Sequence, residues 1–175
     1  MNNFEETVVF IVHSIKQFCF GFEKMNEISE QYSAGSAGLA FFMSAIYQQL
    51  SIFYLIDKKD KPMGGAFYPA LKNIGYEHLL DPIKKLFDTP LGSTTFGEVI
   101  RVFRNKVIVH NEFIDSDLDC IYKKVDMKNS DIQKIWQDLL LKAYVETKLL
   151  AINLAKATGR PLSDFGMTVL EELED

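Results

Sequence analysis

Hydrophobic residues recur at spacings of three and four through most of this chain, and no segment alternates for long between apolar and polar residues. A spacing of three to four places the apolar side chains on one face of a helix, whereas a strand requires a spacing of two. The helical pattern occupies four long stretches, residues 4–28, 37–57, 95–114 and 130–158. The sequence therefore predicts an all-α fold, an antiparallel bundle of four long helices with one or two short ones.

Glycine and proline residues mark the expected boundaries between these helices. Residues 57–65 combine five charged residues with a proline and two glycines, which is typical of a loop. Residues 67–75 and 76–88 each contain a proline, so we expect a short helix in each, the first of them broken by Pro69. Residues 114–119 are rich in aspartate, and this composition indicates a turn.

The length of 175 residues favours one domain with a core of ordinary size. Gly159 and Pro161 follow the last helical stretch and are expected to end it. We therefore assign residues 1–160 to a single helical domain and residues 161–175 to an acidic C-terminal tail.

The net charge of −5 argues against a protein that holds nucleic acid by overall electrostatic attraction, so any contact with RNA has to be local. Residues 37–57 are long enough to span a bilayer, but Gln48, Gln49 and Ser51 would be costly in lipid. We therefore expect this segment to be a central helix of the bundle, with no contact to a membrane.

The cysteine and histidine residues indicate neither a disulfide framework nor a metal centre. Cys19 and Cys120 are 101 residues apart, and His13 and His78 lie in separate segments without metal-ligand spacing. The N-terminus carries two glutamates where an export signal needs positive charge. We expect a cytoplasmic protein with no cofactor and no bound metal.

The aspartates Asp115, Asp117 and Asp119 alternate as in part of an EF-hand loop. Such a loop needs a glycine at its sixth position and a glutamate at its twelfth, where this chain has Cys120 and Asp126. The pattern therefore does not predict calcium binding.

The helix expected from Thr95 onward carries the most unusual polar residues. Thr95 and Glu98 form a capping-box pattern at its start. Two of the three arginines in the chain, Arg101 and Arg104, follow one turn apart. Because a guanidinium presents a fixed fork of donors, this choice favours a phosphate or carboxylate partner over a simple positive charge.

Arg104, Asn105 and His110, with the apolar residues around them, resemble the signature of the HEPN superfamily, an arginine and a polar residue followed by a histidine. The resemblance covers the segment from Phe103 to His110. It implies a metal-independent endoribonuclease, often the toxin of a toxin–antitoxin or phage-defence system. It also implies a homodimer through the helix Thr95–Ile114, with RNA or a nucleotide as ligand and an antitoxin protein as a further partner.

The resemblance assigns roles to individual residues of this chain. His110 would exchange a proton with an RNA hydroxyl, Arg104 would hold the scissile phosphate, and Asn105 would orient either group. Arg101 and Lys106 would bind neighbouring phosphates. An alternative for Arg101 is an ion pair with Glu98 on the helix surface.

Helix geometry alone does not bring Arg104 and His110 together. Six residues of an ideal helix turn through about 240° and rise about 9 Å, which places His110 on the apolar side. A half-buried structural histidine and a surface arginine remain the simpler interpretation. Catalysis would require a distorted helix turn or a second chain. The alternatives in function are a non-catalytic module that binds a nucleotide or a partner protein, and a structural helical assembly protein.

Overall fold

The structure is a computed structural model, and it describes residues 3–31, 45–47, 49–51, 67–105, 116–126, 128–165 and 167. The predicted all-α class is confirmed, since within these residues the only strands are two pieces of two residues each. The elements are α1 (Asn3–Gln31), α3 (Phe67–Asn73), the 3₁₀ helix η1 (Glu77–Leu80), α4 (Asp81–Phe87), β1 (Pro90–Leu91), β2 (Thr94–Thr95), α5 (Phe96–Phe103), α6 (Ser116–Val125), α7 (Ser130–Thr158) and the 3₁₀ helix η3 (Leu162–Phe165).

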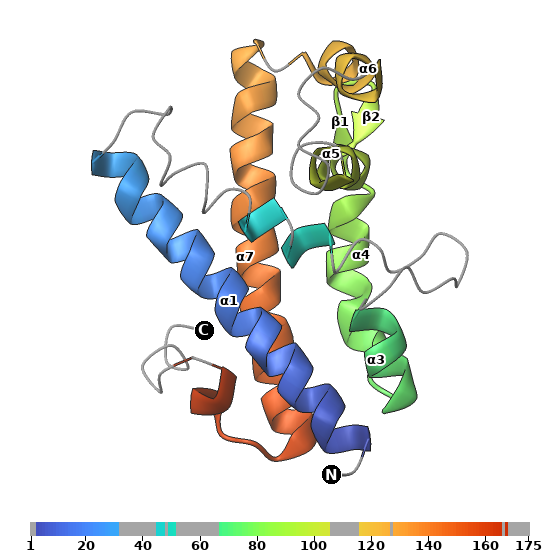
Figure 1. Cartoon of the computed structure of the whole chain (residues 1–175), viewed down its shortest axis with the longest axis vertical. Coiled ribbons are helices and arrows are strands. Elements are labelled where there is room, and N and C mark those ends of the chain that lie inside the picture. Colours follow the sequence, from blue (N-terminus) through green and yellow to red (C-terminus); the bar gives the residue numbers. More distant parts are fainter. Residues whose placement is uncertain are drawn as a thin grey trace.

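Helix α7 is the element against which the others pack. It contacts α1, α4, η1, η3 and β1. Figure 1 shows α1 crossing α7 obliquely with the opposite chain direction, while α4 runs along another side of α7 and leads toward α5 and α6. The two longest helices therefore define the frame on which the shorter elements are mounted.

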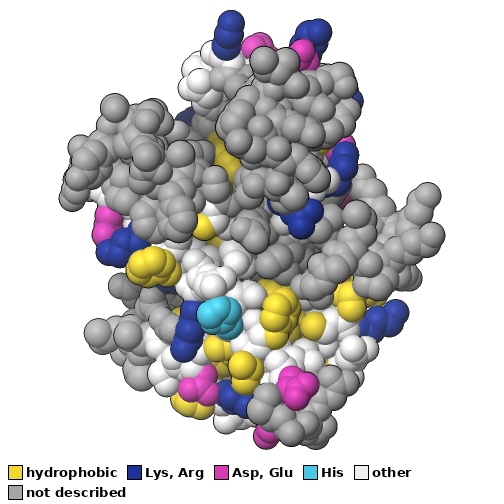
Figure 2. Space-filling model, in the orientation of Figure 1, with side chains coloured by type: hydrophobic (Ala, Val, Ile, Leu, Met, Phe, Trp, Pro, Cys, Tyr) yellow, Lys and Arg dark blue, Asp and Glu magenta, His cyan; other side chains and the backbone are white. Residues whose placement is uncertain are grey.

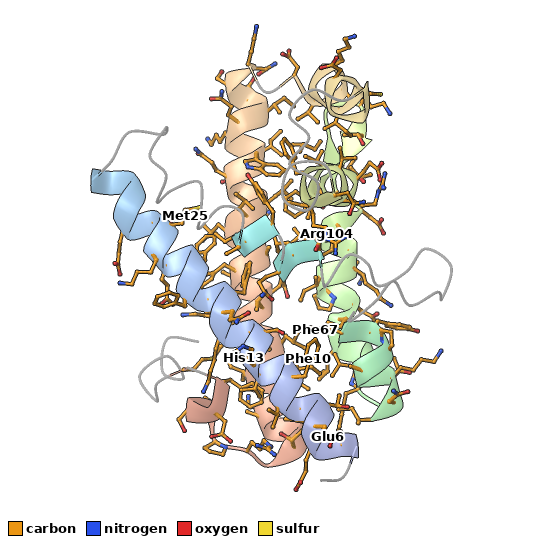
Figure 3. The ribbon with its side chains drawn as sticks, in the orientation of Figure 1. Glu6, Phe10, His13, Met25, Phe67 and Arg104 are labelled. Carbon is orange, nitrogen blue, oxygen red and sulfur yellow. The ribbon has the colours of Figure 1, made fainter. Side chains whose placement is uncertain are left out.

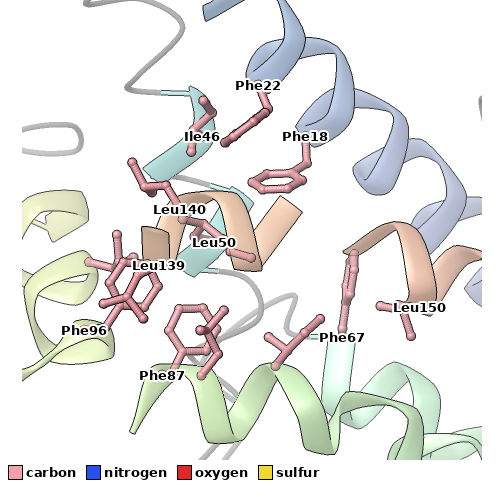
Figure 4. Close-up of a cluster of buried hydrophobic side chains, with 14 of the residues drawn as sticks. Phe18, Phe22, Ile46, Leu50, Phe67, Phe87, Phe96, Leu139, Leu140 and Leu150 are labelled. Carbon is pink, nitrogen blue, oxygen red and sulfur yellow. The ribbon is translucent and has the colours of Figure 1, made fainter. Parts of the chain in front are cut away.

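The core lies between α7 and the elements that cover it. Helix α7 contributes a continuous buried side that includes Trp136, Leu139, Leu140, Ala143, Thr147, Leu150, Ala151, Leu154 and Ala155. Phenylalanines from four other elements meet this side, namely Phe18, Phe67, Phe87 and Phe96 (Figure 4). Burial of such large apolar side chains is the main source of stability.

The bounds predicted for the last helix are confirmed. The side chain of Asn129 caps the start of α7 by accepting a hydrogen bond of 2.9 Å from the amide of Asp131. Gly159 ends the helix in the left-handed conformation, with φ of 65°.

The prolines of the two short helices begin helices instead of breaking them. Pro69 lies in the first turn of α3, so the predicted break at this residue is wrong. Pro82 lies in the first turn of α4. A proline is tolerated in the first turn because its missing N–H would have no acceptor within the helix.

A small hairpin joins α4 to α5 within residues 89–95, which the sequence indicated only as a loop. Pro90 pairs with Thr95 and Leu91 with Thr94, and the intervening turn places Gly92 at φ of 61°. A Cβ atom at Gly92 would collide with the carbonyl oxygen of Lys124 at the end of α6. The turn therefore packs directly on α6, and glycine is needed both for its φ and for the close approach.

Helix α6 corrects the expectation of a turn at residues 114–119, because a helix already begins at Ser116. Ile121 and Val125 are buried and lie four residues apart, so the helix is held by its apolar side. Aspartates near a helix N-terminus interact favourably with its dipole, which explains why an aspartate-rich segment can form the start of a helix. Asp115 lies outside the described residues.

Several expectations fall on parts of the chain outside the described residues, including the loop at residues 57–65 and the acidic residues 168–175. Of the helix predicted at 37–57, residues 45–47 and 49–51 are described; both pieces are helical, and Ile46 and Leu50 are buried. In the described part of the chain, no helix has the length and hydrophobicity needed to cross a membrane. Beyond α7, Phe165 and Met167 are buried in the core.

Candidate functional site

The candidate site is built from the start of α5, where Thr95 caps the helix as predicted. Its backbone is extended, with φ of −116° and ψ of 157°, and its hydroxyl oxygen accepts a hydrogen bond of 3.3 Å from the amide of Glu98. The amide of Phe96 donates to the carbonyl of Thr89, 2.9 Å away. Both bonds fix the first residue of α5, and with it the rotational position of every later residue in the helix.

Aromatic contacts hold α5 at both ends. Phe96 stacks on Phe87, with ring centroids 5.6 Å apart, and meets Trp136 edge to face at 5.3 Å. At the other end Phe103 stacks on Tyr47 at 5.9 Å. Contacts of this kind stabilise a fixed arrangement beyond the area they bury. The helix is therefore a rigid support for the residue that follows it, Arg104.

Arg104 is held in place while part of its hydrogen-bonding capacity is unused. Its Nη1 donates to Oδ1 of Asn105 over 2.8 Å. Its Nε is shielded from solvent and has no hydrogen-bond partner. A buried donor without a partner costs about 1–3 kcal/mol. A hydrogen-bond acceptor at this Nε would remove that cost, and an anion is the acceptor that binds a guanidinium most strongly.

The other two arginines differ from Arg104 because each has a carboxylate partner. Arg101 binds Glu98 through two bonds, Nε to Oε2 at 2.9 Å and Nη2 to Oε1 at 2.5 Å. Arg160 lies 3.6 Å from Asp164. Within the described residues Arg104 makes no ion pair. For Arg101, the structure shows the surface pair with Glu98, so a phosphate there would have to displace a carboxylate.

The backbone changes geometry at Arg104 and Asn105. Helix α5 is regular up to Phe103, and residues 104–105 are π-helical. Wider turns of this kind occur mostly as single turns within α-helices and are frequent at functional sites. The turn per residue at Arg104 and Asn105 therefore differs from that of a regular α-helix.

The remaining residues predicted for the site, Lys106 and His110, lie outside the described residues, as does the rest of the helix predicted to reach Ile114. The structure thus brings Arg104 and Asn105 together and turns Arg101 toward Glu98.

The described histidines lie in other elements. His13 is on α1, at a place in Figure 3 separate from Arg104, and His78 is in η1. Gln17 Nε2 lies 2.8 Å from His13 Nε2, and Oε1 of Gln17 accepts a bond of 2.9 Å from Gln49. This exposed polar chain is absent from the sequence-based expectations, although the spacing of four between His13 and Gln17 on a helix could have indicated it.

Among the described residues there is no group of three or more histidine, cysteine, aspartate or glutamate side chains that could hold a metal ion. On the face drawn in Figure 2, lysine and arginine side chains are scattered among acidic and hydrophobic ones in the coloured area. This distribution agrees with a net charge of −5 and with an anion contact limited to one or two residues.

Where α1 crosses α7, Tyr144 is the titratable group with a displaced pKa. The pKa of its hydroxyl is raised from 10.0 to about 12, chiefly by burial; Lys148 acts to lower this pKa, and Glu23 acts to raise it. The hydroxyl donates to Oε1 of Glu23 over 2.7 Å, and the ring stacks on Phe22 at 4.4 Å. This cluster joins two helices and is separate from α5.

Comparison of the chain with protein-family models, with curated proteins and with solved structures found no match.

Proposed function

We propose that the protein is a metal-independent endoribonuclease of HEPN type in which Arg104 binds the scissile phosphate of RNA. The observation that supports this most directly is the state of Arg104, a guanidinium with no carboxylate partner in the described part of the chain and with a shielded Nε that lacks an acceptor. A phosphate oxygen that binds the guanidinium neutralises its charge, and Nε gains this acceptor once the side chain moves out of its shielded position.

The proposed reaction uses the 2′-hydroxyl of the substrate as nucleophile. His110 accepts the proton of this hydroxyl, the oxygen forms a bond to phosphorus, and the bond to the 5′-oxygen of the next nucleotide breaks. The departing oxygen takes up a proton, and the products are a 2′,3′-cyclic phosphate and a 5′-hydroxyl end. Arg104 stabilises the charge that develops on the phosphate, and Asn105 holds Arg104 in position.

Further parts of the proposal concern the surroundings of the site. Lys106 binds a neighbouring phosphate, and Arg101 does so only after exchanging Glu98 for it. A second copy of the chain contributes its own helix from Thr95 to Ile114, so that two composite sites form about a two-fold axis. The setting is the cytoplasm, with an antitoxin protein as the partner that restrains a toxic activity.

The proposed dimer is tested by light scattering at micromolar concentration together with a disulfide cross-link. We expect a dimer, and cysteines introduced along the helix after Thr95 should cross-link between copies. A dimer in which none of these positions reacts would contradict a contact through this helix.

Cleavage is tested on a mixed RNA pool at low ionic strength with EDTA present, because a chain of net charge −5 binds RNA weakly and salt weakens it further. We expect cyclic phosphate ends and no cutting of DNA, which lacks the 2′-hydroxyl. Arg104→Ala should reduce the rate about 10²- to 10³-fold, as for other groups that stabilise transition-state charge. Arg160→Ala, which removes an arginine already paired with Asp164, is the control and should retain activity.

Loss of cleavage on chelation, equal cutting of DNA, or full activity of Arg104→Ala would each exclude the mechanism. The second candidate is a non-catalytic module that binds a nucleotide. It is favoured by the same pair, since Arg104 and Asn105 can hold a phosphate without any proton-transfer group. Its signature is nucleotide binding by calorimetry that is lost in Arg104→Ala, with no cleavage of RNA by the wild type.

A further inference from the structure

The side of α7 that faces away from the core carries an exposed apolar stripe. Leu141, Val145 and Leu149 follow one another at spacings of four, and their side chains are 52%, 47% and 37% exposed. Ile135, 40% exposed, lies six residues before Leu141 and is rotated from it by about 240°, so it stands outside this stripe. Single exposed apolar residues are common, but three in succession on one side of one helix form a continuous surface.

This stripe lies on the opposite side of α7 from the candidate site. Val145 follows Trp136 by nine residues, which corresponds to a rotation of about 180° around the helix. Trp136 is buried against Phe96 of α5. The stripe therefore faces away from α5, and any partner that covers it leaves the region of Arg104 accessible.

One border of the stripe carries a lysine and a glutamate, Lys142 and Glu146. Lys142 and Glu146 lie one turn apart along the same border of the stripe, and neither makes an ion pair within the described residues. When two copies of such a helix meet in antiparallel orientation about a two-fold axis, each border faces the same border of the other copy. Lys142 then lies opposite Glu146 of the second copy, and the symmetry forms this pair twice.

We propose that this surface, defined by Leu141, Val145 and Leu149, binds the same surface of a second copy, with the two α7 helices antiparallel and the two-fold axis passing beside Val145. Under this symmetry Val145 meets Val145 of the second copy, and Leu141 meets Leu149. The apolar stripe is thereby covered by an apolar stripe, and lysine faces glutamate along the border.

The size of the contact sets the expected affinity. Residues 138–152, which lie symmetrically about Val145, span about 22 Å of helix, and two helices about 10 Å wide that touch over this length bury roughly 800 Å² in total. This is the low end for specific interfaces, so we expect a dissociation constant in the micromolar range. The contact does not depend on the proposed ribonuclease activity, and it uses a different surface from the dimer proposed for the helix at Thr95.

A cysteine at the symmetry axis provides the first test. Val145→Cys is introduced in a chain whose two natural cysteines are replaced by serine, and the protein is oxidised at about 50 µM. The geometry predicts a disulfide between the two copies. Asn153→Cys on the same helix is the control, because eight residues from the axis its copies lie about 24 Å apart in the antiparallel arrangement. Equal cross-linking of both variants, or none for Val145→Cys, would overturn the proposal.

The second test measures mass and charge pairing in solution by sedimentation equilibrium. Val145→Asp should lower the mass of the wild type to that of the species that forms without this interface. Lys142→Glu and Glu146→Lys should each weaken association about three- to tenfold, as expected for two exposed ion pairs, and the double variant should restore it. RNA cleavage by Val145→Asp is assayed in parallel as an independent readout. An unchanged mass for Val145→Asp, or a double variant weaker than both single ones, would refute this interface.

Discussion

Replacement of Arg104 by methionine should stabilise the fold, although the same residue is proposed to bind the substrate. Methionine has a helix propensity close to that of arginine and keeps an unbranched side chain for packing. The substitution removes the shielded Nε that has no acceptor. Arg101→Met, three residues earlier on the same helix, is the matched comparison because Arg101 is fully engaged with Glu98.

The two substitutions should change the free energy of unfolding in opposite directions. At Arg104, removal of an unsatisfied buried donor gains about 1–3 kcal/mol, and loss of the bond to Asn105 costs about 0.5–1.5 kcal/mol. The expected net gain is about 1 kcal/mol. At Arg101, loss of an ion pair whose side chains are 39% and 34% exposed costs about 0.5–1 kcal/mol after allowance for solvent screening.

Urea unfolding followed by tryptophan fluorescence measures this difference. The chain has one tryptophan, Trp136, whose side chain is buried against α5. With a slope of about 2 kcal/mol per molar urea, the midpoints of Arg104→Met and Arg101→Met should differ by about 0.8–1 M. A loss of more than about 1 kcal/mol in Arg104→Met would show that the guanidinium makes stabilising contacts. That result would contradict the proposed anion site at Arg104.

Three further predictions concern stability. Because the pKa of Tyr144 is raised from 10.0 to about 12 in the folded state, its contribution is complete below pH 10 and is lost as the pH rises toward 12. Chemical unfolding between pH 9 and 12 should therefore show a shallower decline for Tyr144→Phe, which keeps the stack on Phe22. Gly92→Ala should cost at least 1 kcal/mol more in thermal melts than Gly75→Ala; both glycines have positive φ, but only Gly92 lacks room for a Cβ. Thr95→Ala should cost about 1 kcal/mol through loss of the helix cap, whereas Thr95→Ser should be nearly neutral in the same melts.

The long helices could be predicted because local signals agree with their burial. The last helix has an apolar side with helical spacing and a glycine at its end, and the structure follows both signals. The capping of α5 by Thr95 was likewise visible in the sequence.

The errors arose where composition was allowed to outweigh position. The presence of Pro69 predicts a broken helix, whereas its place in the first turn makes it harmless. The aspartates near Ser116 predict a turn, although the buried residues Ile121 and Val125 supply the apolar side of a helix. Tertiary packing decides whether such segments form helices, and a local sequence pattern carries little information about tertiary contacts.

The state of the candidate site could not be deduced from the sequence. The partner of Arg101 was one of two possibilities that spacing allowed, and the structure shows the pair with Glu98. The shielding of Nε in Arg104 depends on atoms brought in by the fold, and the π-helical geometry that follows α5 has no sequence signal of its own.

The fixed start of α5 makes the number of residues before Arg104 as important as the arginine itself. Thr95 pairs with Pro90 in the hairpin and accepts a hydrogen bond from the amide of Glu98, so the position at which the helix begins is fixed. One residue inserted after Glu98 would turn the arginine by about 100° and advance it by 1.5 Å. Because the cap fixes the first residue of the helix, residues 96–103 should tolerate changes of side chain far better than insertions or deletions.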